Sequence, residues 1–416
     1  MARDASSKSE ARNASDTVSE LECEFGDVLA SLRRHPAAPT PDLAPRILAR
    51  IRARRIFQRS IAVCLPLAVL SALLVIWDIR YSQTVEIASA SDAFAPVKSQ
   101  RDSDRSPTTS NTAVPLDAQL DRARSWLLRH QDPNGGWSLG RTGASANYAV
   151  GTSALALMAL MTGHQTDEIR GAILKGLAFL ASSQSPDGLF GPQITGSIYN
   201  HALACLALLR ARGELAVGSD VDRALRRGVD LLVRNQHADG GWSYLRSGAS
   251  PNSSVTVWAL QVLMEAEAAH LGDFRRSIEQ GFAWLESTIG PDGRVGYRRD
   301  GDHPNGPETL TAAAALCFFE RDPHVDERLA RMLDHVRRDA LDSAKPMDLY
   351  RAFFQTALLR AESPNDSELL NLTSRIRAAQ VAEGQEAGSW PPLDRWSVAG
   401  GRVYSTAMAI LALYGR

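Results

Sequence analysis

Two kinds of apolar pattern alternate along residues 115–416. In the first kind, apolar side chains recur at helical spacing on one face, as at Leu120, Ala123 and Leu127, and the opposite face is charged. In the second kind almost every residue is apolar, as in 152–161. A one-sided stripe predicts a helix with one face in water, and an apolar surface all round predicts a buried helix. Later stretches of the second kind are 201–209, 255–264, 311–319, 352–359 and 405–413.

A short turn separates the two helices of most pairs. Its first copy, residues 131–137, reads Gln-Asp-Pro-Asn-Gly-Gly-Trp, and Gly135, Gly188, Gly240 and Gly293 lie 53, 52 and 53 residues apart. A period of this length is typical of repeat proteins. Proline ends the first helix, Asn-Gly or Asp-Gly suits a tight turn, and the aromatic residue is expected to fill the space between units. The turn residues are Gly135, Gly136, Trp137, Gly188, Phe190, Gly240, Gly241, Trp242, Gly293 and Trp390.

Six such pairs predict an all-α fold, an (α/α)6 barrel or toroid of six helical hairpins over residues 115–416. Amphipathic first helices would form the outer ring and buried second helices the inner ring. An open superhelix of stacked hairpins is the alternative, because stacked repeats normally form solenoids. The apolar second helices favour the closed barrel.

The residues before the barrel predict a membrane anchor. Residues 1–45 are polar and interrupted by prolines, so we expect a mostly disordered cytoplasmic segment. A basic juxtamembrane helix with six arginines follows at 46–59, then an apolar stretch at 60–80 whose residues 61–77 carry no charge. This stretch predicts one transmembrane helix; a buried core helix is the alternative. Residues 81–114 are rich in Ser, Thr and Asp and predict a flexible linker.

The arginines also predict orientation. They precede the span, so the positive-inside rule places the N-terminus in the cytoplasm and the barrel on the extracytoplasmic side of a bacterial inner membrane. The net charge of −1 gives no reason to expect nucleic acid as a partner. The four cysteines are scattered and form no C-x-x-C pair, so we expect no disulfide framework, no metal and no cofactor.

The recurring Gln-x-x-x-Gly-Gly-Trp turn, followed by an inner helix of small residues, resembles the prenyltransferase and squalene-oxidase repeat. This repeat is shared by squalene and oxidosqualene cyclases and by protein prenyltransferase β-subunits. More loosely it is similar to the thioester-containing domain of complement-type proteins. The resemblance covers residues 116–416 and implies a terpene cyclase-like toroid. Because this fold hosts several chemistries, function has to be argued at the site.

The catalytic signatures of these families are mostly missing. Squalene–hopene-type cyclases use an acidic D-x-D-D cluster at the start of an inner helix, and the nearest acids here are Asp300, Asp302 and Glu308. These are the candidate proton donors; the alternative is a solvated surface turn. Protein prenyltransferases hold zinc with Asp, Cys and His. His201 and Cys205 share one helix face but have no evident third ligand.

The starts of the inner helices would line a concave ligand site at one end of the barrel. The candidate ligand-binding residues there are Tyr148, Tyr199, Asn200, His201, Trp258, Tyr350 and Tyr404. The leading hypothesis is therefore a membrane-anchored, non-catalytic module that binds an unknown protein or an apolar ligand. The first alternative is a terpene cyclase-like or prenyltransferase-like enzyme acting on an isoprenoid or other lipid. The second is a transmembrane regulator of anti-sigma type, because a cytoplasmic arm precedes a single span.

Overall fold

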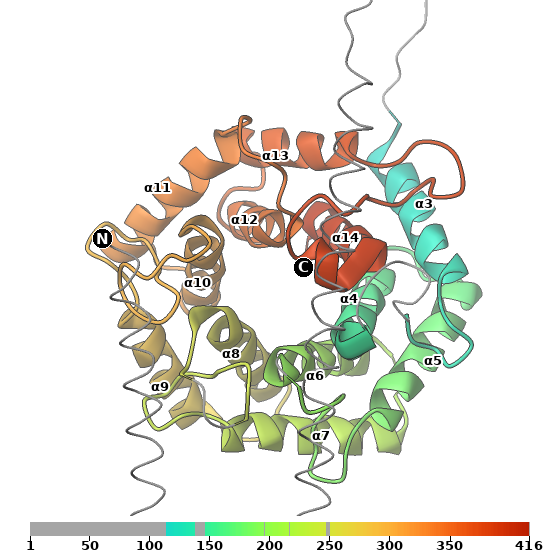
Figure 1. The fold of residues 1–416 in the computed structure, drawn as a ribbon, viewed down its shortest axis with the longest axis horizontal. Helices are drawn as coiled ribbons and strands as arrows, with labels where there is room; N and C mark the ends of the chain where they lie inside the picture. Colours follow the sequence, from blue (N-terminus) through green and yellow to red (C-terminus); the bar gives the residue numbers. More distant parts are fainter. Residues whose placement is uncertain (1–113, 138–145, 195, 216, 247–249, 416) are drawn as a thin grey trace, which may run out of the picture. The chain divides into compact units, whose positions relative to one another are not determined.

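Twelve α-helices in the described part of the chain form two concentric rings (Figure 1). The structure is a computed structural model and describes residues 114–415, apart from 138–145, 195, 216 and 247–249. The outer ring consists of α3 (Leu116–Arg129), α5 (Asp167–Ser182), α7 (Ser219–Arg234), α9 (Arg275–Glu286), α11 (Glu327–Leu341) and α13 (Ser367–Ala378). The inner ring consists of α4 (Ala149–Met161), α6 (Ser197–Glu214), α8 (Ser253–Ala268), α10 (Glu308–Arg321), α12 (Leu349–Glu362) and α14 (Ser397–Tyr414). A short 3-10 helix, Ala146–Tyr148, precedes α4.

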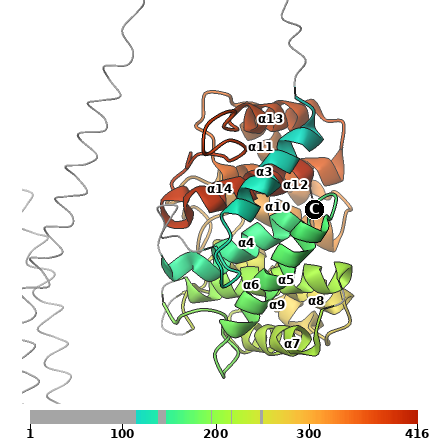
Figure 2. The same cartoon turned by 90° about the vertical axis from the view of Figure 1, so that its right-hand side faces the viewer.

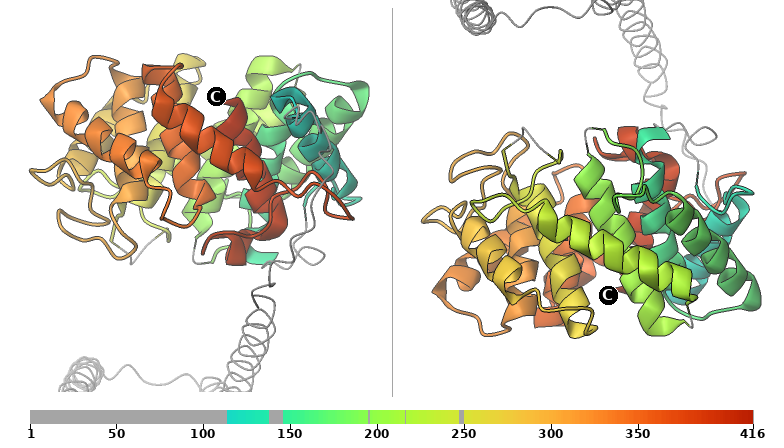
Figure 3. Two further views of the ribbon diagram at one scale, coloured as in Figure 1. Left: turned by 90° about the horizontal axis from the view of Figure 1, so that it is seen from above. Right: turned by 90° about the horizontal axis from the view of Figure 1, so that it is seen from below.

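The inner ring is closed. Each inner helix contacts the next one, and α14 contacts both α4 and α3 at the point where the ring begins. A side view and two further views, from above and from below, show the outer helices lying around the inner ones (Figures 2 and 3). The predicted toroid of six hairpins is therefore confirmed, and the open superhelix is wrong.

Burial follows the two sequence patterns. On the outer helix α7, Leu225, Val229 and Leu232 are fully buried, whereas Arg226 and Arg227 on the other face are exposed. On the inner helix α10 the four consecutive alanines 312–315 have no exposed surface. Small side chains let a helix approach its neighbours on every side, which is what the crowded inner ring requires.

A glutamine at the end of four outer helices joins neighbouring units. The side-chain amide of Gln236 donates to the carbonyl oxygen of Gly240 in its own turn (2.7 Å) and to that of Ser277 on the next outer helix (2.8 Å). Gln131 and Gln184 make the same pair of bonds. Gln380 repeats them to Gly388 and to Gln119, so the sixth unit holds the first. Neighbouring units are thus connected by hydrogen bonds from a glutamine side chain to backbone carbonyls.

The aromatic residue of each turn is fixed by its own backbone. Trp137, Phe190, Trp242 and Trp390 have no exposed surface. Their buried backbone N–H groups need acceptors. Each donates to a side chain on the inner helix of the same unit, at 2.9–3.1 Å: Ser153, His201, Thr256 and Thr406. In the fourth unit the buried Val295 takes this place and donates to Thr311. The turn is therefore attached to both helices of its hairpin.

None of the helices within residues 114–415 that the structure describes has the length and apolar character needed to cross a membrane. The predicted span at 60–80, the basic helix at 46–59 and the segments 1–45 and 81–113 lie outside the described residues. They remain predictions.

The turn glycines should be intolerant of a side chain. Gly240 has φ +102°, and a Cβ there would collide with the carbonyl oxygen of Gln280 on the next outer helix. We expect Gly240→Ala to destabilise the barrel by more than about 2 kcal/mol, seen as a lower thermal unfolding midpoint of the full chain. Gly301→Ala is the matched control: φ is +75° there, but no atom lies within 4 Å of the added Cβ. Equal losses in the two variants would show that the close approach of the backbones is unimportant.

Candidate functional site

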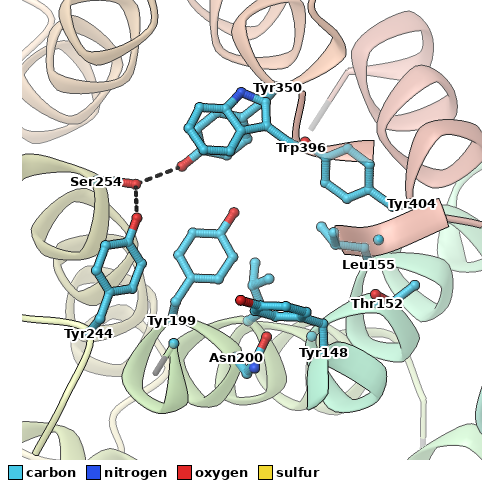
Figure 4. A pocket seen from close by; sticks show the side chains of 14 residues that line it. Tyr148, Thr152, Leu155, Tyr199, Asn200, Tyr244, Ser254, Tyr350, Trp396 and Tyr404 are labelled. Carbon is cyan, nitrogen blue, oxygen red and sulfur yellow. Dashed lines mark hydrogen bonds between the residues drawn. The ribbon is translucent and has the colours of Figure 1, made fainter. Parts of the chain in front are cut away.

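A cavity of about 230 Å³ lies among the first turns of the inner helices. Its wall is largely aromatic: five tyrosines and one tryptophan line it, namely Tyr148, Tyr199, Tyr244, Tyr350, Tyr404 and Trp396 (Figure 4). Asn200, Thr152, Ser254 and Leu155 add to the wall. The described lining residues include no charged side chain. The arrangement is suited to an apolar ligand with a small number of polar contacts.

The fold brings the tyrosines together from distant parts of the chain. Tyr148 directly precedes α4, Tyr199 lies in the first turn of α6, and Tyr350 in that of α12. Tyr404 follows Gly401, whose φ of 64° and ψ of −165° interrupt α14. The ring centroids of Tyr199 and Tyr350 are 6.4 Å apart, within the usual range for interacting aromatic rings.

A chain of hydrogen bonds fixes one side of the wall. The Tyr244 hydroxyl donates to Ser254 (3.3 Å), and the Ser254 and Tyr350 hydroxyls are 3.5 Å apart (Figure 4). The indole N–H of Trp258 donates to the Tyr350 oxygen at 2.8 Å. Burial is the main cause that raises the pKa of Tyr199, Tyr350 and Tyr404. These phenols therefore stay protonated near neutral pH and can donate hydrogen bonds.

Two carboxylates lie directly behind this wall. Asp348 caps α12 by accepting from the Arg351 N–H (2.9 Å), and it also accepts from the indole N–H of Trp396 at 3.3 Å. Asp394 accepts from the N–H groups of Leu349 and Ser397. Burial raises the pKa of Asp348, and the neighbouring negative charge of Asp394 raises it further. The sequence analysis missed both residues, although an aspartate just before an inner helix is a visible capping signal.

The predicted acids lie elsewhere. Glu308 begins α10 in a separate polar cleft and forms an ion pair with Lys345 (2.9 Å). Burial alone would raise the pKa of Glu308, but the hydrogen bond from Lys345, a backbone hydrogen bond and the positive charges of Lys345 and Arg351 together lower it. Asp302 pairs with Arg298 at 3.3 Å, and Asp300 is exposed. None of these three residues lines the aromatic cavity, and no observation tests a catalytic role for them.

The predicted ligand residues divide into two groups. Tyr148, Tyr199, Asn200, Tyr350 and Tyr404 line the cavity. Trp258 lies behind Tyr350, and His201 faces the outer ring. His201 accepts from the Phe190 N–H at Nδ1 (3.1 Å), and its Nε2–H donates to the Gly228 carbonyl (2.9 Å). Both ring nitrogens are thus used in packing.

A metal centre finds no support in the described residues. His201 has Cys205 as its only predicted partner, 3.6 Å away, and burial raises the pKa of that thiol. Across the described ranges of 114–415, no group of three or more His, Cys, Asp or Glu side chains is arranged to hold a metal ion.

Comparisons with known proteins find sequence similarity to terpene cyclases over part of the chain. The family model of the squalene–hopene cyclase C-terminal domain matches residues 111–250 and 154–300. A drimenyl diphosphate synthase from Streptomyces showdoensis is 28% identical over 193 residues, covering 45% of this chain and 33% of the relative. A squalene–hopene cyclase from Zymomonas mobilis is 27% identical over 144 residues, covering 32% and 21%. The chain therefore matches about a third or less of the length of these relatives.

The fold alone is shared more widely. An α-amylase from Clostridium perfringens aligns with a TM-score of 0.54 over 74% of this chain and 99% of its own, at 9% identity. Because an identity this low shows only a common fold, the sequence similarity to cyclases and the cavity itself must support any functional statement.

The buried His201 should make stability depend on pH. Burial lowers its pKa from 6.5 to about 4, so between these pH values the unfolded chain binds a proton that the folded chain does not. The free energy of unfolding should therefore fall as pH drops from 6.5 to 4, by on the order of 3 kcal/mol, and be insensitive to this group above 6.5. Urea unfolding of His201→Thr should lose this part of the pH dependence, because threonine does not titrate in this range. The variant should still fold, since Thr256 accepts the equivalent backbone N–H in the third unit. An unchanged slope would contradict the assignment.

Proposed function

We propose that the toroid is a terpene cyclase-like domain that binds an isoprenoid, or a similarly apolar group, in the aromatic cavity. The observation that carries this proposal is the wall of five tyrosines and Trp396 at the starts of the inner helices. The match to the squalene–hopene cyclase C-terminal domain over residues 111–300 supports it. Burying an isoprenoid chain against aromatic rings is favourable because both surfaces leave water.

The size of the cavity limits the ligand. Small-molecule sites usually enclose about 300–1,000 Å³, and this cavity measures about 230 Å³. It would accommodate a group of one or two isoprene units, or the end of a longer chain. A whole triterpene would need the inner helices to separate.

The comparisons favour a second, catalytic form of this proposal, in which the domain cyclises its ligand. Cyclisation can begin when an acid gives its proton to an alkene carbon: the acid O–H bond breaks, a C–H bond forms, and the resulting cation lies against aromatic faces. Asp348 is the candidate acid because its pKa is raised and its carboxylate bonds to Trp396 of the wall. The absence of a carboxylate among the described lining residues supports the non-catalytic form.

Ligand binding should depend on the cavity wall. We expect the full chain to bind geraniol, measured by equilibrium dialysis, and Tyr199→Ala to weaken binding about tenfold, because an aromatic contact of about 1.4 kcal/mol is lost. Tyr414→Ala is the control, since Tyr414 ends α14 outside the cavity and is exposed. Failure of the wild-type chain to bind geraniol, or equal effects of both variants, would remove the proposal.

Turnover would separate the two forms. If the domain is an enzyme, incubation with farnesol, farnesyl diphosphate or squalene should give cyclic products by gas chromatography and mass spectrometry. Asp348→Asn should then reduce the rate by about 10²–10⁴, whereas Glu308→Gln, in the separate cleft, should not. Loss of activity in Glu308→Gln alone would instead support the acid predicted from the sequence. If no substrate gives a product but the chain still binds geraniol, the catalytic form is wrong and the non-catalytic binding module stands.

A further inference from the structure

Two leucines lie at the inner end of the aromatic cavity, toward the middle of the barrel. Leu155 is the seventh residue of α4 and Leu203 the seventh of α6, and both line the cavity. At a rise of about 1.5 Å per residue, each lies about 9 Å along its helix from the first residue. The other described lining residues on inner helices are among the first four of their helix, except Tyr404, which follows the kink at Gly401. Along α4 and α6 the leucines are therefore the deepest part of the wall.

The two leucines form one apolar layer. Helices α4 and α6 are neighbours in the inner ring and contact each other, so equivalent positions on them lie at the same depth (Figure 1). Leu155 is 2% exposed and Leu203 is 1% exposed, and no other leucine is among the described lining residues. An apolar ligand that enters from the starts of the inner helices thus ends its path against these side chains.

Beyond this layer the interior of the barrel is charged. Met158, three residues further along α4, lines a second space of about 600 Å³ at the other ends of the inner helices. There the Arg210 guanidinium donates to the Met158 sulfur (3.5 Å) and pairs with Glu265 at 3.0 Å. The leucine layer, about one helical turn thick, therefore separates an aromatic space from a charged one.

We propose that Leu155 and Leu203 set the length of the ligand: the cavity accepts an isoprenoid group of up to two units, and the two leucines exclude a third. The inference rests on the proposed isoprenoid-binding function and adds the residues that decide which chain length fits. It predicts that the length preference changes with the size of these two side chains and with no other buried leucine of the same helix.

Three alcohols that differ by one isoprene unit each, namely prenol, geraniol and farnesol, test the proposal on the full chain. Equilibrium dialysis gives the ratio of the farnesol affinity to the geraniol affinity, in which the greater general hydrophobicity of farnesol is the same for every variant. Leu203→Ala leaves an apolar void at the closed end of the cavity, and such voids bind apolar groups. We expect this variant to raise the ratio about fivefold over that of the wild-type chain.

Leu157→Ala is the matched control. Leu157 lies on the same helix as Leu155 and has no exposed surface, but it faces the outer ring, where a Cβ added to Gly176 of α5 would collide with its Cδ2. Both truncations leave a buried void and destabilise the fold by a similar mechanism. Only the void at Leu203 adjoins the cavity, so Leu157→Ala should keep the ratio within about twofold of the wild-type value.

A variant in the opposite direction keeps the test valid if Leu203→Ala does not fold by circular dichroism. Leu155→Phe places a larger side chain at the closed end, and the cavity in front of Leu155 gives the ring room to enter. This variant should bind geraniol about tenfold more weakly than the wild-type chain, while its affinity for the shorter prenol stays within about twofold.

The outcomes separate this inference from the proposed function. An unchanged ratio in Leu203→Ala, an equal rise in Leu157→Ala, or unchanged geraniol binding in Leu155→Phe would overturn the inference but leave an isoprenoid site in place. Binding of none of the three alcohols to the wild-type chain would overturn the proposed function itself.

Discussion

The two hydrogen bonds from one glutamine side chain to two backbone carbonyls are the interaction on which the ring depends. One carbonyl belongs to the glutamine's own turn and the other to the next outer helix, as for Gln236 with Gly240 and Ser277. A buried carbonyl must be paired wherever the chain places it, so this bridge sets the spacing of neighbouring outer helices. The inner helices follow that spacing, and their first turns converge on the aromatic cavity. Local polar chemistry on the outside of the barrel thus determines where a ligand site forms inside.

The ring is uneven where this bridge is missing. In the fourth unit Ile289 stands in place of glutamine, and the fifth unit lacks the whole turn. There the Asp339 carboxylate, whose side chain is 5% exposed, accepts from Lys345 and Gln355 and pairs with Arg351. A charged cluster joins α11 to α12 where four of the other units bury an aromatic ring and the fourth unit buries Val295. The carboxylate is thus fully paired, and a polar cleft lined by Asp339, Lys345 and Glu308 lies beside it.

The architecture could be predicted from the sequence because it rests on local patterns. A repeat of 52 or 53 residues and helices that are apolar all round leave few alternatives to two concentric rings. The cavity could be predicted only in part. The sequence analysis placed the ligand site correctly at the starts of the inner helices, but the position of each residue around its helix decides whether it faces inward. Asn200 lines the cavity, and His201, turned by about 100° on the same helix, lies against the outer ring.

The residues that the sequence analysis missed are those that tertiary structure brings in from loops. Tyr244 follows the third turn, and Asp394 and Trp396 precede α14. No periodic pattern marks these positions, and only the path of each loop over the ends of the inner helices decides whether it reaches the cavity. Asp348 became visible as a candidate acid only through its distance to Trp396. The place of these residues at the cavity therefore depends on tertiary contacts that no local sequence pattern predicts.

Closure of the ring has a consequence for how the chain folds during synthesis. The amide of Gln380 bonds to the carbonyl of Gln119, 261 residues earlier in the sequence. A linear repeat array can add one unit at a time and has end units that fray. Here the first outer helix leaves the ribosome with one flank uncovered and gains its second neighbour only when the last hairpin is complete. Contacts of such long sequence separation slow folding, so the first hairpin is the segment that a chaperone or a protease would meet while the barrel is still open.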